Sequence, residues 1–183
     1  MVAVMRALPK ICRHLHLPGQ SGSTSVLARM RRRHTRDDYL KLVDRLRTAM
    51  PDIALSTDMI VGFPGETAEE FEDTLSLTSA VGYHSMFSFK YSERPNTLAV
   101  KRLADDVSAA EKTRRIVALQ ELQKGIQAKM HRRRVGRVVE GIKILRGLWG
   151  DGEFSHSGKY YQFADVELLP KPVQQPMPIL IAA

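Results

Sequence analysis

The residues best suited to chemistry lie in loops that follow short apolar segments. The first such loop, QSGS at 20–23, places the amide of Gln20 and the hydroxyl of Ser21 directly after a possible strand at 15–17. In α/β folds, ligands bind at the carboxyl ends of the strands. His14 and His16 alternate with leucines and could hold a metal, but catalytic zinc needs three protein ligands and no third is evident. The loop therefore predicts a ligand contact, with metal binding as the alternative.

A second loop, GFPGE at 62–66, follows a β-branched apolar run at 53–61. Gly62 and Gly65 flank Pro64, so the backbone can approach a ligand closely. Glu66 is placed to accept a hydrogen bond from a hydroxyl or an amine. The alternative is an ordinary turn between a strand and a helix, in which Thr67 caps the helix.

The third segment, FKYSERPNT at 89–97, combines cations with an aromatic ring. Lys90 and Arg94 could pair with a carboxylate or a phosphate, and Tyr91 could stack on a base. Solvated loop charges are the alternative explanation.

Arginines are concentrated in two clusters, which account for the basic character of the chain. The formal net charge is +8, with 24 Lys and Arg against 15 Asp and Glu in residues 1–137, and 4 against 5 in residues 138–183. Clustered guanidinium groups favour phosphate, although charge runs also occur as solvated faces. The clusters predict RNA contact and consist of Arg29, Arg31, Arg32, Arg33, His34 and Arg36, and of His131, Arg132, Arg133, Arg134 and Arg137.

The elements that would position these residues alternate between strand and helix. Helices are predicted at 25–30, from Thr35 to about residue 50, from Thr67 to 81, and from Ser108 through 126. The last three begin with a Ser or Thr followed three residues later by Asp or Glu, which is the spacing of a capping box. Strands are predicted at 53–61 and 83–91. This order indicates a piece of a βα barrel or of a doubly wound sheet.

Beyond residue 134 the pattern changes. A helix is predicted at 138–149, then short strands around Gly158 to Phe163, a segment with four prolines at 170–178, and a strand at 179–183. No apolar run reaches the roughly 18 residues of a membrane span, and no signal peptide is evident. With a single cysteine, Cys12, the chain fits a reducing cytoplasm.

Several segments, taken in order, resemble the MiaB-type tRNA methylthiotransferases, which are radical S-adenosylmethionine enzymes. They are ICRHLHLPGQSGS, VLARMRRRHTRDDYLKLVDRLR, PDIALSTDMIVGFPGET and FKYSERPNTLA, and they extend over about residues 1–137. The resemblance implies addition of a methylthio group to a modified adenosine beside a tRNA anticodon, with S-adenosylmethionine and 4Fe–4S clusters as cofactors and tRNA as partner. No protein partner is implied.

By similarity, seven residues would face S-adenosylmethionine or substrate: Gln20, Ser21, Asp58, Gly62, Phe63, Glu66 and Arg94. Arg31, Arg32, Arg33, Arg132, Arg133 and Arg134 would contact RNA. The family binds its radical-generating cluster through a CxxxCxxC motif, and such clusters need several thiolates. Cys12 cannot replace that motif, so we expect the transferase to be catalytically incomplete in this chain. Asn96 also stands where the family commonly has glycine.

The tail, from about Val138, resembles instead an internal stretch of luciferase-like oxidoreductases, which use a flavin or cofactor F420. RGLW, GKYYQ and LLPKPVQ carry this resemblance. We therefore expect an α/β chain with two parts: a partial βα (TIM-like) barrel of the radical S-adenosylmethionine type at 1–137, and a luciferase-like α/β fragment at 138–183 in place of a TRAM domain. Two alternative functions remain, a non-catalytic RNA-binding fragment and a flavin or F420 oxidoreductase fragment.

Overall fold

The computed structural model describes residues 2–8, 11–133 and 140–173. The chain divides into two compact units, Met1–Arg133 and Arg134–Ala183. The predicted boundary between residues 137 and 138 lies outside the described residues. Each unit has its own sheet, so the two are described separately.

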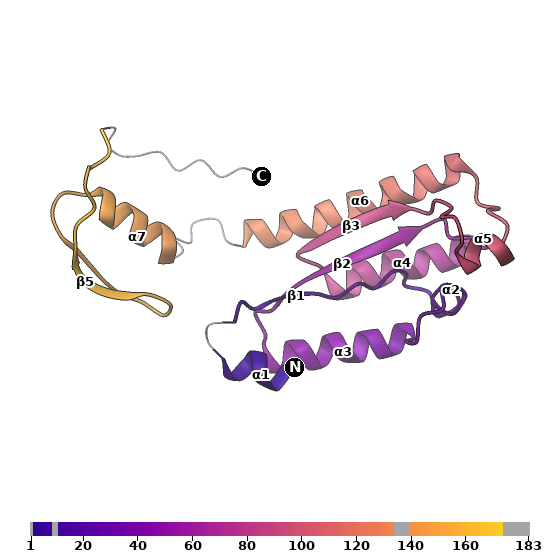
Figure 1. Cartoon of the computed structure of the whole chain (residues 1–183), viewed down its shortest axis with the longest axis horizontal. Helices are drawn as coiled ribbons and strands as arrows, with labels where there is room; N and C mark the ends of the chain where they lie inside the picture. Colours follow the sequence, from indigo (N-terminus) through magenta and orange to yellow (C-terminus); the bar gives the residue numbers. More distant parts are fainter. Residues whose placement is uncertain (1, 9–10, 134–139, 174–183) are drawn as a thin grey trace. The chain divides into compact units, whose positions relative to one another are not determined.

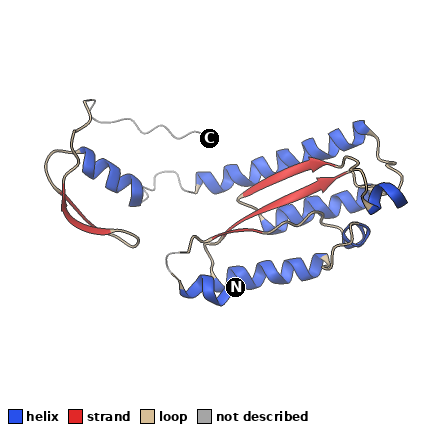
Figure 2. Cartoon of the chain, in the orientation of Figure 1, coloured by secondary structure: helices blue, strands red, loops and turns tan. Residues whose placement is uncertain are grey.

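The first unit is built on a parallel sheet of three strands (Figures 1 and 2). The strands are β1 (His14–His16), β2 (Ala54–Val61) and β3 (Ser85–Lys90), and β2 lies in the middle. Pairing aligns His16 with Ser56, and Asp58 with Phe87. All three strands therefore end at the same edge of the sheet, where the loops singled out in the sequence follow them.

Helices connect the strands and cover one face of the sheet (Figure 1). Between β1 and β2 lie α2 (Thr24–Arg29) and α3 (Arg36–Ala49), and α4 (Ala68–Val81) joins β2 to β3. After β3 come α5 (Leu98–Arg102) and the long α6 (Ala109–Arg132), while α1 (Val2–Ala7) precedes the sheet. This alternation confirms the predicted mixed α/β fold of a partial barrel.

Local sequence explains where these helices begin. Thr35 and Thr67 each accept a hydrogen bond from the backbone N–H three residues ahead, and Asp38 and Glu70 accept from the capping residues in return. Ser108 likewise caps α6 by accepting from the backbone N–H of Glu111. These side chains satisfy amide groups that the first helical turn leaves without partners, so all three predicted starts are confirmed.

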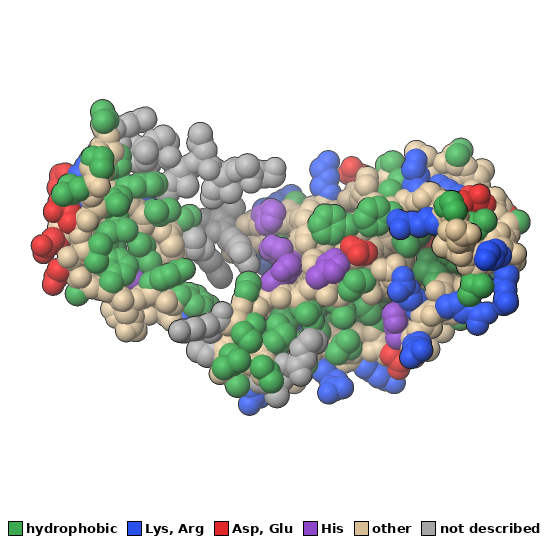
Figure 3. Space-filling view, viewed as in Figure 1, with side chains coloured by type: hydrophobic (Ala, Val, Ile, Leu, Met, Phe, Trp, Pro, Cys, Tyr) green, Lys and Arg blue, Asp and Glu red, His purple; other side chains and the backbone are tan. Residues whose placement is uncertain are grey.

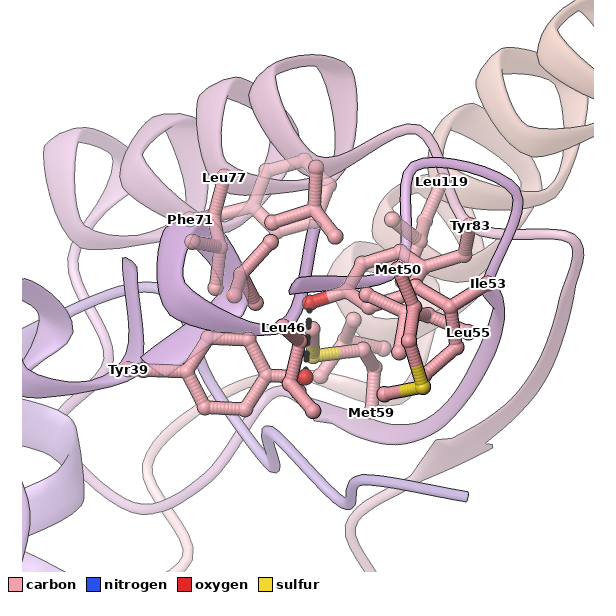
Figure 4. Close-up of a cluster of buried hydrophobic side chains, with 13 residues drawn as sticks. Tyr39, Leu46, Met50, Ile53, Leu55, Met59, Phe71, Leu77, Tyr83 and Leu119 are labelled. Carbon is pink, nitrogen blue, oxygen red and sulfur yellow. Dashed lines mark hydrogen bonds between the residues drawn. The ribbon is translucent and has the colours of Figure 1, made fainter. Parts of the chain in front are cut away.

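The core lies between the sheet and its helices. Alternate β2 residues, Leu55, Met59 and Val61, are buried there, as expected for a strand whose side chains alternate between two faces. Two buried tyrosines meet within this core: Tyr83 donates its hydroxyl hydrogen bond to Tyr39 over 3.1 Å (Figure 4). Burial without a charged partner raises the pKa of both phenols, so both remain neutral hydroxyls at physiological pH.

The opposite face of the sheet carries polar and aromatic side chains. On this face of β2, Ser56 is buried, while Asp58 and Ile60 are half-buried. Phe87 and Phe89 of β3 are 59% and 53% exposed. In a closed barrel this face would line the interior. Within the first unit, no described element forms a layer that covers it.

Two helices of the first unit were not predicted. α1 is short, and α5 follows the loop with Asn96 at φ 67°, a left-handed conformation. Thr97 caps α5 by accepting from the N–H of Val100. The predicted strand at 83–91 is shorter in the structure because Tyr83 turns into the core before β3 begins.

The second unit consists of α7 (Glu140–Trp149) and a two-stranded antiparallel sheet of β4 (Phe154–Ser157) and β5 (Gln162–Val166). The carboxylate of Glu140 accepts from the backbone N–H groups of Tyr160 and Tyr161 and lies 3.2 Å from the ring of His156. The predicted helix is present over its described residues. The strands lie elsewhere than predicted: Gly158, Tyr160 and Tyr161 belong to the turn between β4 and β5, and only Phe163 lies in a strand. The strand predicted at 179–183 and most of the proline-rich segment lie outside the described residues.

Candidate functional site

A pocket of about 710 Å³ lies where the strands of the first unit end. Loops after all three strands and the helices α2 and α5 contribute to it. Lys and Arg side chains gather over this end of the unit (Figure 3). Its lining consists of Gln20, Arg29, Met30, Arg31, Arg32, Asp58, Ile60, Phe63, Phe89, Lys90, Tyr91, Ser92, Arg94, Thr97, Leu98 and Ala99.

Gln20 extends the sheet into this pocket. Its backbone N–H donates to the carbonyl of Asp58, and its carbonyl accepts from the N–H of Ile60. The residue has φ 67°, in the left-handed region that residues other than glycine rarely adopt. Arg31 in the same lining has φ 59°. Backbone strain of this kind concentrates at ligand sites.

The arginines of the pocket fall into two groups. Arg29 donates to Glu70 and to the carbonyl of Gly65, and Arg32 donates to the side-chain oxygen of Gln20 over 3.0 Å. These two guanidinium groups are held in place by the protein. Within the described ranges no protein acceptor holds the side chains of Arg31 and Arg94, so both can reach an anion.

Aromatic rings form a second feature of the pocket. The rings of Phe63 and Tyr91 meet edge to face with centroids 5.1 Å apart, and Phe89 projects from the end of β3. Edge-to-face packing fixes the orientation of both rings. A flat aromatic ligand could stack on such a surface while the arginines bind its negative charge.

Asp58 is the only acidic residue in this lining. Its carboxylate lies 3.3 Å from Nε2 of His16, which projects from the neighbouring strand on the same face. His16 thus has a carboxylate partner, and no group of three or more potential metal ligands occurs among the residues that the structure describes.

Three residues predicted to contact S-adenosylmethionine lie outside the pocket lining. Ser21 is buried, and its hydroxyl lies 3.4 Å from that of Thr74 and accepts from the N–H of Ser23. The N–H of Gly62 donates to the carboxylate of Glu66 over 2.6 Å.

Glu66 forms a buried ion pair with Arg115 of α6 over 2.7 Å. Burial raises the pKa of Glu66, and Arg115 opposes that rise without cancelling it. Arg115 also donates to the carbonyl of Glu66 and so ties α6 to the loop after β2. The observed partners of Glu66 are thus protein groups that hold the loop in place.

The described members of the two arginine clusters lie at opposite ends of the first unit. α6 runs back along the sheet, because Thr113 near its start lies beside Lys90 and Gln127 near its end donates to the carbonyl of His84 (Figure 1). Arg132 and Arg133 are therefore far from the pocket. Arg33 is exposed outside the lining, and Arg134 lies outside the described residues.

Sequence reasoning did not identify the contribution of α5. Thr97, Leu98 and Ala99 line the pocket because α5 begins there. The available signal was Thr97 as a helix cap ahead of the run LAVKR, which is short for a helix. Ile60 was also missed, because an apolar residue in a strand gives no sign of which face it occupies.

A 4Fe–4S cluster does not fit the residues present. The sequence has one cysteine, Cys12, whose side chain is exposed. Cluster ligation requires several thiolates, so these 183 residues do not supply the ligands. No helix in the described ranges is long and apolar enough to cross a membrane.

The three-stranded parallel sheet with a pocket at its strand ends is consistent with a partial α/β fold of the radical S-adenosylmethionine type, and the comparisons agree. Residues 1–78 match the model of the radical SAM superfamily. Residues 118–183 match that of the luciferase-like monooxygenases, beginning inside α6. Both resemblances noted in the sequence are thereby confirmed.

Curated relatives point to one kind of enzyme, named tRNA-2-methylthio-N(6)-dimethylallyladenosine synthase. The relative from Solibacter usitatus is 46% identical over 153 residues, covering 81% of this chain and 34% of the relative. That from Pelobacter propionicus is 56% identical over 124 residues, covering 68% and 28%. That from Desulfosudis oleivorans is 52% identical over 141 residues, covering 76% and 30%. The chain thus spans about a third of the length of these relatives and is similar to MiaB-type tRNA methylthiotransferases.

Proposed function

We propose that the first unit is the nucleotide-binding half of a tRNA methylthiotransferase barrel. It binds a segment of tRNA, or S-adenosylmethionine, in the pocket at the strand ends. The observation that carries this proposal is the combination of available arginines, Arg31 and Arg94, with the ring surface of Phe63, Tyr91 and Phe89. Nucleotides present the same combination of negative charge and a flat ring.

S-adenosylmethionine has groups that suit this lining. Arg94 or Arg31 would bind its carboxylate, and the rings with Ile60 would contact its adenine. When bound, this cofactor supplies the radical precursor in enzymes of this kind. The protein groups bind and orient it, and Gln20 and Arg32, which hold each other, keep one wall of the pocket fixed.

The radical chemistry itself requires ligands from another polypeptide segment, because Cys12 is the only thiol in the chain. We therefore propose that these residues bind without catalysing methylthiolation. Anaerobic reconstitution of the 183-residue chain with iron and sulfide tests this point. We expect an iron and sulfide content well below one 4Fe–4S cluster per chain. A content of one cluster per chain would contradict this proposal.

Binding is tested with a fluorescent RNA stem-loop that carries an adenosine-rich loop, using fluorescence anisotropy at several salt concentrations. S-adenosylmethionine is tested in parallel by equilibrium dialysis. We expect the double variant R31A/R94A to weaken RNA binding about tenfold or more. The slope of log affinity against log salt should fall by about one for each phosphate group that the variant no longer neutralises.

The matched control is R132A/R133A, which removes the same charge at the end of α6. If only total charge matters, the two double variants weaken binding equally, and the pocket is not the binding site. If R31A/R94A binds as the natural sequence does, the proposal is wrong. A non-catalytic RNA-binding role is favoured if RNA binds and S-adenosylmethionine does not.

A further inference from the structure

His16 and Asp58 form a pair that the proposed binding role leaves unexplained. His16 lies in β1 outside the pocket, and Asp58 lies in β2 at the pocket wall. Both side chains emerge on the face of the sheet that helices do not cover. An acidic residue among five basic ones would weaken the binding of a simple anion, so its presence suggests a second type of ligand group.

Both nitrogens of the His16 ring have partners. Nδ1 lies 2.9 Å from the hydroxyl of Ser56, and Nε2 lies 3.3 Å from Oδ2 of Asp58. The ring of Phe87 packs edge-on against the imidazole with centroids 6.4 Å apart. The register of the sheet places His16 beside Ser56, and Asp58 two residues further along, so the strands themselves fix this geometry.

These partners determine the tautomer of a neutral ring. An ionised carboxylate only accepts hydrogen bonds, and an unprotonated Nε2 facing it at 3.3 Å would repel it, so Nε2 of a neutral His16 ring carries the proton. Nδ1 then accepts a hydrogen bond from the hydroxyl of Ser56. The imidazole is therefore held through Nδ1, and its Nε2 faces Oδ2 of Asp58.

No hydrogen bond to the other carboxylate oxygen, Oδ1 of Asp58, occurs within the described residues. Because Oδ2 faces the imidazole, Oδ1 is the oxygen available to a ligand in the pocket. We propose that His16 is a positioning residue that orients Asp58 to accept a hydrogen bond from an amine of the bound ligand. The ligand class is an aromatic anion that carries an amino group.

This inference rests on the proposed nucleotide site and refines its specificity. The probes are adenosine 5′-monophosphate and purine riboside 5′-monophosphate, which share the phosphate, the sugar and the ring nitrogens and differ only in the amine. Calorimetry on the full chain should give about tenfold tighter binding of the amine-bearing nucleotide, because the ring without the amine has no donor for the carboxylate.

Two variants separate positioning from a structural role. In H16Q the amide nitrogen can occupy the place of Nε2 and donate to Asp58, whereas in H16N it can reach only the place of Nδ1. We expect H16Q to keep most of the tenfold preference and H16N to lose it, while both keep the weaker affinity for purine riboside monophosphate. Equal behaviour of H16Q and H16N overturns the proposal.

The tautomer provides a test that needs no ligand. The ¹⁵N shifts of the His16 ring at about pH 8, assigned by comparison with H16N, should show the proton on Nε2. A proton on Nδ1 overturns the proposal. If neither nucleotide binds, the proposed function fails as well; if both bind equally tightly, this inference alone is wrong.

Discussion

Glu66 and Glu70 lie four residues apart at the start of α4, and their surroundings shift their pKa values in opposite directions. Glu66 is enclosed by the protein, and burial raises its pKa. Glu70 receives hydrogen bonds from Arg29, Ser25 and the backbone of Thr67, and the Arg29 hydrogen bond is the main cause that lowers its pKa to about 2. The two carboxylates therefore contribute differently to stability as pH changes.

Replacing Glu70 should change the acid limb of the stability curve. Because its folded pKa of about 2 lies below the ordinary 4.5, its contribution is complete above 4.5 and is lost as pH falls toward 2. We expect E70Q to reduce the free energy of unfolding by about 2 kcal/mol at neutral pH, and much less near pH 2. Urea unfolding across this range measures it, with E72Q, on the exposed side of the same helix, as control. A constant difference at every pH would contradict the prediction.

Removing Arg115 should destabilise the first unit strongly. R115M leaves the carboxylate of Glu66 buried without its cation, which costs about 3–5 kcal/mol. The double variant E66Q/R115M should recover much of this loss because it also removes the buried charge. The urea midpoints of the two variants test this prediction. Equal losses of stability would show that lost packing, and not the buried charge, causes the destabilisation.

At the scale of elements, capping explains why α3, α4 and α6 begin where they do. Each cap is a local pattern, so sequence alone located all three starts. The short α5 depends instead on the turn at Asn96 and on neighbouring groups. The pocket depends on this unpredicted helix, because α5 supplies part of the pocket wall.

The cap of α4 can be tested separately. T67A removes the acceptor for the N–H of Glu70 and should cost about 1 kcal/mol of unfolding free energy. The control T113A changes the same residue type inside α6, where the side chain is exposed and alanine is the better helix former. Thermal unfolding should show T113A at or above the natural melting temperature. Equal losses would show that the cap contributes nothing specific.

At the scale of the molecule, the first unit contains a complete set of core residues from α3, β2, α4 and α6. This cluster includes Leu46, Met59, Phe71, Leu77 and Leu119, and all of its buried members lie between Tyr39 and Leu119. The unit therefore has a core made from its own elements. The other face of its sheet is not covered by any described element of the same unit.

A chain that ends at Arg133 should keep the stability of the first unit. We expect its urea midpoint to match that of the corresponding transition in the full chain, because the core lies within residues 39–119. The transition is followed by circular dichroism and by tyrosine fluorescence. A large loss of stability would mean that residues after 133 contribute to the core.

The sequence by itself determined the alternation of strands and helices, the three caps, the two resemblances and six pocket residues: Gln20, Asp58, Phe63, Lys90, Tyr91 and Arg94. These follow from local patterns of polarity and turn chemistry, or from motifs in a fixed order. Only the tertiary structure decided that Arg31 and Arg32 join this pocket while Arg132 and Arg133 lie at the far end of α6, and that Glu66 faces Arg115. The reason is physical: strand register and helix packing bring together side chains from distant segments, and a sequence does not show which neighbours a side chain meets.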